Sequence, residues 1–77
     1  MTKKLSDLTA HERGRVIAVQ GDGQIRRRLF DMGVTPSAEV IMRKKAPLGD
    51  PIEITLRGYE LTLRKAEAAC VDVEIGA

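Results

Sequence analysis

The stretch Ile52–Arg64, with the sequence IEITLRGYELTLR, decides the fold of this chain. Apolar and polar residues alternate through two runs of it, and Gly58 separates the runs. Alternation with a period of two indicates a strand with one buried face and one solvated face, and a glycine between two such runs favours a tight hairpin. The stretch therefore predicts two antiparallel strands joined by a short turn.

Three further segments predict strands, which makes five in all. Five short antiparallel strands cannot bury their apolar faces as a flat sheet, so we expect them to curl into a small barrel that leaves few exposed edges. The chain has 77 residues, so we expect a single mainly β domain over residues 1–77. The three further strands are Arg13–Gln20, Glu39–Lys45 and Val71–Ile75.

A short helix is predicted over Gln24–Met32, between the first two strands. Asp22 is a suitable N-cap for it, and Gly33 is a suitable residue to end it. A brief helical turn over Lys65–Ala69 is expected before the last strand. The apolar stripe of the helix, spaced as i, i+4 and i+7, consists of Ile25, Leu29 and Met32.

Phe30 lies off this apolar stripe, roughly 100° around the helix from Leu29. An aromatic residue at that position either packs at the edge of the core or contacts a partner, and both interpretations stay open. Two basic clusters, Arg26–Arg28 and Arg43–Lys45, have the composition of phosphate-gripping sites. The chain contains one Phe, one Tyr and no Trp, which argues against a base-stacking platform for single-stranded nucleic acid.

The loop Ala46–Pro51, with the sequence APLGDP, carries more conformational specification than a plain turn needs. Its two prolines withhold backbone donors, Gly49 permits unusual dihedral angles, and Asp50 can accept hydrogen bonds from nearby amides. Loops placed by a rigid scaffold commonly carry binding functions. The loop is therefore a candidate binding site or a structural connection, with Asp50 expected to fix the loop rather than to ligate a metal.

The composition points away from catalysis and towards a binding module. His11 and Cys70 are single residues, and neither is near a partner in sequence that would make a nucleophile–base pair or a metal cluster. One cysteine cannot form an internal disulfide, and no apolar run reaches membrane-spanning length, so the expected location is the cytoplasm. Residues 1–45 carry a net charge of +5 and residues 46–77 carry −3. This difference is consistent with a region that faces an acidic partner, or with the ordinary mixed-charge surface of a soluble domain.

Three blocks in order, Leu29–Pro36, Ala46–Ile52 and Leu61–Ala68, resemble the FeoA family of ferrous iron transport accessory proteins. The resemblance covers about residues 5–75. It implies a five-stranded SH3-like barrel, with the short helix after the first strand and the helical turn before the last. It also implies a small cytosolic partner of FeoB, a bacterial membrane transporter of ferrous iron with a cytoplasmic GTP-binding domain, and no catalytic residue.

The chain departs from the family pattern at two turns. Ala10-His11 and Pro36-Ser37 stand where the family often has Pro-Gly. A type II turn favours glycine at its third position, so Ser37 predicts a type I turn.

The preferred hypothesis is a non-catalytic module that docks on the transporter, with no resident cofactor or metal. A small barrel that binds nucleic acid through the basic clusters, and a regulator that binds Fe²⁺ weakly and directly, are alternatives. A homo-oligomer stays open, as does a peripheral position at the inner membrane through the transporter. The candidate contact residues are Arg26, Arg27 and Phe30 on the helix, and Pro47, Leu48, Gly49 and Asp50 in the loop.

Overall fold

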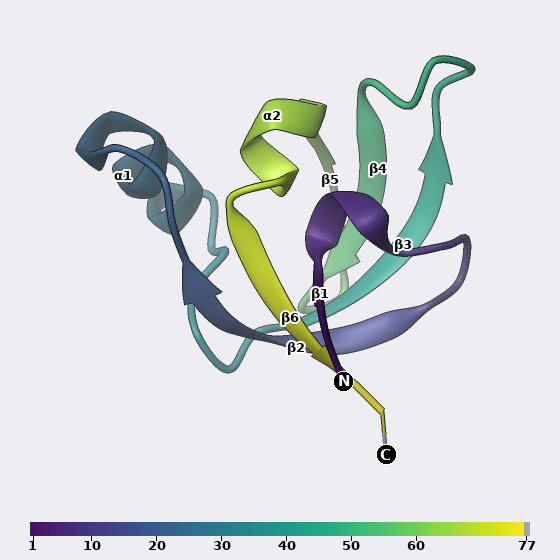
Figure 1. The fold of residues 1–77 in the computed structure, drawn as a ribbon, viewed down its shortest axis with the longest axis horizontal. Coiled ribbons are helices and arrows are strands. Elements are labelled where there is room, and N and C mark those ends of the chain that lie inside the picture. Colours follow the sequence, from purple (N-terminus) through teal and green to yellow (C-terminus); the bar gives the residue numbers. More distant parts are fainter. Residues whose placement is uncertain (77) are drawn as a thin grey trace.

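Six strands form one curled antiparallel sheet in the computed structural model, which describes residues 1–76 (Figure 1). The order across the sheet is β1-β6-β2-β3-β4-β5. Two α-helices and one 3-10 helix, η1, complete the fold. The bounds are β1 Thr2–Lys4, η1 Leu5–Asp7, β2 Arg13–Val19, α1 Gly23–Asp31, β3 Glu39–Lys45, β4 Ile52–Leu56, β5 Tyr59–Leu63, α2 Lys65–Ala68 and β6 Val71–Ile75.

The mainly β architecture predicted from the sequence is confirmed, with one strand more than expected. The additional strand, β1, pairs antiparallel with β6, and Thr2 faces Glu74. Three residues are too few to show an alternating pattern, so only the pairing with β6 reveals this strand. No helix within residues 1–76 is long and apolar enough to cross a membrane.

The hairpin predicted around Gly58 is confirmed. β4 and β5 pair in register from Ile52 with Leu63 to Leu56 with Tyr59, which leaves a two-residue loop. Arg57 and Gly58 both have positive φ, 50° and 90°. Two positive φ values in succession define a type I′ turn, whose twist matches that of the flanking strands.

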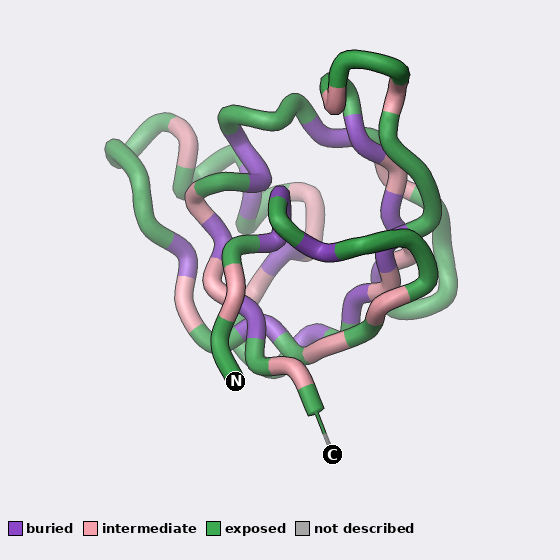
Figure 2. The backbone as a smooth tube through the Cα atoms, turned by 45° about the vertical axis from the view of Figure 1, so that its right-hand side comes forward, coloured by how far each residue is buried: buried purple, intermediate pink, exposed green. Residues whose placement is uncertain are grey.

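Two irregularities bend the sheet into its curl. The pairing of β2 with β6 shifts register between Val16 and Ala18, and the pairing of β3 with β4 shifts between Met42 and Lys44. Such bulges increase local twist and bend a strand. The buried residues gather inside the curl (Figure 2). They include Val16, Leu29, Val40, Met42, Ile52, Ile54, Leu56, Leu63, Val71 and Val73.

Both predicted ends of α1 are confirmed by hydrogen bonds. The carboxylate of Asp22 accepts from the backbone N–H of Ile25 at 2.9 Å, which satisfies one of the donors exposed at the helix start. At the other end Gly33 has φ 94°, and its N–H donates to the carbonyl of Phe30. The N–H of Val34 donates to Leu29, which completes a Schellman motif.

The prediction of a type I turn at Ser37 is wrong. Ser37 has φ 81°, and the N–H of Ala38 donates to the carbonyl of Thr35, as in a type II turn. Two bonds to β2 explain this choice, because Ser37 N–H donates to Val16 and Val16 N–H donates to Ala38. Tertiary hydrogen bonds thus override the local preference of serine.

The turn before β2 has the same form. His11 has φ 68°, and the N–H of Glu12 donates to the carbonyl of Thr9 at 3.0 Å. A second bond, from His11 N–H to the carbonyl of Met42, attaches this turn to β3. Both departures from the Pro-Gly pattern therefore keep the backbone shape that glycine favours.

Candidate functional site

The loop Ala46–Pro51 joins β3 to β4 and stands out from the sheet at the upper right of Figure 1. The N–H of Gly49 donates to the carbonyl of Ala46 at 2.7 Å, and the N–H of Ala46 donates to Pro51 at 3.0 Å. The peptide bond between Asp50 and Pro51 is cis. The two hydrogen bonds within the backbone of the loop close it into a defined shape.

Asp50 accepts a hydrogen bond, as the sequence predicted, although its donor is distant in the chain. Its Oδ1 atom lies 3.0 Å from the backbone nitrogen of Lys65, the first residue of α2. The carboxylate thus ties the loop to the helix that follows β5. Leu48, at the tip of the loop, exposes 91% of its surface and contributes nothing to the core.

The helix candidates Arg26, Arg27 and Phe30 are all exposed on α1. The guanidinium of Arg26 lies over the ring of Phe30, 5.7 Å from its centroid, which is within the range of a cation–π contact. Phe30 exposes 38% of its surface, so its ring is only partly covered. The neighbouring Arg28 points elsewhere, and its Nε atom pairs with a carboxylate oxygen of Glu67 at 3.2 Å.

The structure separates the two groups of candidates. α1 lies at the left of Figure 1 and the loop Ala46–Pro51 at the upper right, with α2, which contacts both, between them. Arg26, Arg27 and Phe30 therefore form one surface, the α1 surface. Pro47, Leu48, Gly49 and Asp50 form another, the loop surface.

The second basic cluster is largely engaged within the fold. Arg43 Nε donates to Thr55 Oγ1 at 2.6 Å, and Lys45 Nζ donates to the carbonyl of Ser6 at 2.9 Å. Lys44 pairs with Glu53 at 3.6 Å. Arg43 and Lys45 therefore have close partners within the fold, whereas Lys44 stays largely exposed.

Ion pairs join the basic first half of the sequence to the acidic second half. The strands interleave, so the acidic second half lies beside the basic first half. Lys4 pairs with Asp72 at 2.7 Å, and the amino terminus pairs with Glu74 at 3.0 Å. These pairs favour the ordinary mixed-charge surface, and a region that faces an acidic partner stays a prediction, with the α1 surface as its exposed basic candidate.

Hydrogen bonds to these carboxylates shift their pKa values. The bonds from Lys4 and Gln20 lower the pKa of Asp72, and those from the amino terminus lower the pKa of Glu74. The pKa of Glu12 is lowered by the backbone N–H of Thr9 and then by Lys3. Asp72 and Glu74 join paired strands and Glu12 stabilises a turn, so all three carboxylates have a structural role.

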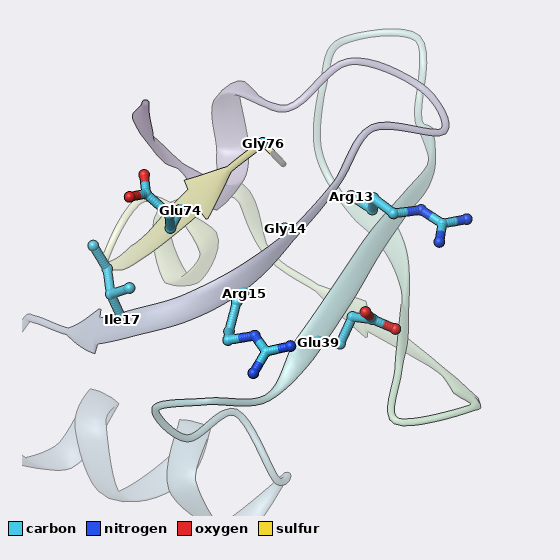
Figure 3. A pocket seen from close by; sticks show the side chains of 7 residues that line it. All are labelled: Arg13, Gly14, Arg15, Ile17, Glu39, Glu74 and Gly76. Carbon is cyan, nitrogen blue, oxygen red and sulfur yellow. The ribbon is translucent and has the colours of Figure 1, made fainter.

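A shallow hollow of about 370 Å³, which the sequence did not predict, lies on the outer face of the sheet (Figure 3). Arg13 and Arg15, two positions apart on β2, project to this outer face, and Gly14 between them lines the hollow with its backbone. In the strand pairing Arg15 faces Glu39 on one side and Glu74 on the other. Only the register brings these residues together, so no local pattern could have found them.

The single histidine and cysteine are not part of a cluster. His11 is exposed in its turn, and Cys70 is partly buried against the core, where its Sγ atom faces the carbonyl of Ala66 at 3.5 Å. Within the described residues no three His, Cys, Asp or Glu side chains lie close enough together to hold a metal ion.

Two solved structures share this fold and a substantial part of the sequence. A FeoA-like protein from Clostridium acetobutylicum is 37% identical with a TM-score of 0.90, over 99% of this chain and 88% of that one. FeoA from Stenotrophomonas maltophilia, solved in complex with zinc and described as a procaryotic SH3 domain protein, is 35% identical with a TM-score of 0.79. That comparison covers 96% of this chain and 89% of the other. The SH3-like fold expected from the sequence is thus confirmed.

A curated relative extends the comparison to a much longer protein. It is the Fe(2+) transport protein A/Fe(2+) transporter FeoB fusion protein of Porphyromonas gingivalis, which is 31% identical over 72 residues. The match covers 94% of this chain and 8% of the relative, so the chain spans a small part of that protein's length. The FeoA domain profile matches residues 3–75. The chain therefore belongs to the FeoA domain family, as its three sequence blocks predicted.

Proposed function

We propose that this chain is a non-catalytic accessory module of bacterial ferrous iron uptake that docks on the cytoplasmic GTP-binding part of a FeoB-type transporter. The observation that carries the proposal is the Porphyromonas gingivalis relative, in which a FeoA domain and FeoB are fused in one chain. Fusion keeps two partners at high effective concentration, as is useful for domains that act on each other. A cytoplasmic location, peripheral to the membrane through the transporter, belongs to the same proposal.

Two surfaces are suited to docking. The α1 surface offers two exposed arginines and an aromatic ring, which are residue types enriched in interfaces between proteins. The loop surface offers an exposed leucine on a hydrogen-bonded loop. Because the two surfaces lie on either side of α2, they are suited to different parts of one partner or to two partners.

NMR titration tests the proposal directly. Isotopically labelled protein is titrated with the cytoplasmic domain of the FeoB-type transporter from the same organism, to high micromolar concentration. We expect resonance shifts at Arg26, Arg27 and Phe30 or at Leu48 and its neighbours. If neither surface responds, the chain does not dock on this domain. Ile17→Ala removes an exposed aliphatic side chain from β2 and serves as a control that should leave binding unchanged.

The two alternatives are distinguished by simple controls. Nucleic-acid binding through phosphates should weaken by orders of magnitude between low and moderate salt. Arg43 and Lys45 give it little support, because both donate hydrogen bonds within the fold. Direct binding of Fe²⁺ stays a prediction, and anaerobic calorimetry would reveal it as saturable heat.

A further inference from the structure

We propose that Leu48 is a preformed anchor that enters an apolar pocket of the docking partner, an inference that rests on the proposed docking function. Leu48 exposes 91% of its surface, against 47% for Ile17 and for Tyr59. One exposed leucine is ordinary on a protein surface. What distinguishes Leu48 is the way in which the loop holds it.

The backbone of the loop is held on both sides of the leucine. The N–H of Gly49 donates to the carbonyl of Ala46, which closes a β-turn with Pro47 and Leu48 at its two central positions. The N–H of Ala46 donates to the carbonyl of Pro51, which closes the base of the loop. Pro47 and Pro51 also restrict φ before and after the tip. Leu48 is therefore displayed by a shaped loop rather than by a flexible one.

A third contact fixes the loop to the rest of the molecule. The carboxylate of Asp50 accepts from the backbone N–H of Lys65 at 3.0 Å, and Lys65 begins α2. Asp50 thus acts as a positioning residue that holds Leu48 at a set place relative to the barrel. A group that is ordered before binding loses less conformational entropy on binding, so its contact contributes more to affinity.

The surroundings of the loop favour a protein pocket over a lipid surface. Of the two lysines that lead into the loop, Lys45 donates to the carbonyl of Ser6 and Lys44 stays largely exposed beside Glu53, so the segment falls short of the polybasic cluster that anionic lipids attract. Stable attachment to a membrane needs more than one weak apolar or basic element. A single branched aliphatic side chain on a rigid support instead fits one closed apolar pocket. Leucine is less common than Trp, Tyr or Arg among interface hot spots, but hot spots do cluster in such well-packed, desolvated pockets.

Calorimetric titration of the full 77-residue chain with the cytoplasmic domain of the FeoB-type transporter tests the anchor. Leu48→Ala should weaken binding at least tenfold, as truncation of a hot-spot side chain does. Leu48→Met keeps the apolar volume and should stay within about threefold of the original affinity. Ile17→Ala removes an aliphatic side chain elsewhere and should change nothing.

Two variants of Asp50 test its role in positioning Leu48. Asp50→Ala removes the acceptor for Lys65 N–H and should weaken binding several-fold while it speeds exchange of that amide. Asp50→Asn keeps an acceptor oxygen and should restore most of the affinity. Equal affinity of Asp50→Ala and the original chain would overturn the positioning role.

The possible failures are distinguishable. If the original chain binds and Leu48→Ala binds equally well, the anchor is refuted and docking stands. If the original chain shows no binding at all, docking fails and the anchor fails with it. If Leu48 instead governs binding to anionic phospholipid vesicles while the cytoplasmic domain does not bind, the ligand is a lipid surface and the proposal is overturned.

Discussion

Substituting Gly14 by alanine should destabilise the protein because β2 and β6 approach each other too closely for a side chain there. A Cβ atom at this position would lie 2.6 Å from the carbonyl oxygen of Glu74 and closer still to Cγ1 of Val73. Carbon atoms in contact normally lie roughly 3.5–4.0 Å apart. Val73 is fully buried, and the oxygen belongs to the backbone, so neither can move aside without shifting β6.

The expected cost follows from this overlap. Overpacking of a filled core costs about 1–3 kcal/mol, and the rigid backbone neighbour favours the middle of that range. For a domain of this size, about 2 kcal/mol lowers the melting temperature by about 8–16 °C. Thermal unfolding followed by circular dichroism measures the change, and urea titration should give the same loss of unfolding free energy.

Gly23→Ala provides a control with the same chemical change. A Cβ atom there would meet nothing within 4 Å, and Gly23 is not among the glycines with positive φ. Alanine restricts the unfolded chain and suits a helix start, so stability should stay equal or rise by up to about 1 kcal/mol. If Gly14→Ala melts at or above the temperature of Gly23→Ala, the inferred close approach of β2 and β6 is incorrect.

Three further predictions concern the helix cap, a turn and the ion pairs. Asp22→Ala removes the acceptor for Ile25 N–H and should cost about 1 kcal/mol in urea-induced unfolding. Ser37→Gly relieves a positive φ and should stabilise the protein by up to about 1 kcal/mol, whereas a lower melting temperature would contradict the type II turn. The lowered pKa values of Asp72 and Glu74 imply stability that is present at neutral pH and lost as the pH falls below their ordinary values of 3.8 and 4.5. Asp72→Asn should flatten this acid dependence of the unfolding free energy.

Those parts of the fold that depend on local signals could be predicted from the sequence. The hairpin at Gly58 and the ends of α1 at Asp22 and Gly33 each follow from residues within a few positions of one another. The strand β1 and the type of the turn at Ser37 could not be predicted, because each depends on hydrogen bonds to a distant strand. Those bonds select a backbone conformation that the local residues do not favour by themselves.

For the candidate contact residues, too, local preferences could be predicted from the sequence and long-range contacts could not. The sequence singled out the loop Ala46–Pro51 and predicted Asp50 as a hydrogen-bond acceptor, because prolines, glycine and aspartate have strong local preferences. It could not identify Lys65 as the donor, since this bond joins residues 15 positions apart. Nor could it show that sequence halves of opposite charge interleave across the sheet, which leaves the α1 surface as the principal set of exposed arginines among the candidates.

The leucine at the loop tip is separate from the interactions that stabilise the barrel. Leu48 is outside the buried core, whereas the loop that carries it is fixed by backbone bonds and by Asp50. Truncating Leu48 therefore leaves both the core and the support of the loop in place. Mutation of Asp50, by contrast, alters the support and leaves the leucine intact. Truncation of Leu48 removes the contact with the partner, and mutation of Asp50 removes the support that positions the leucine. Comparing the affinities of the two variants therefore distinguishes loss of the contact from loss of its positioning.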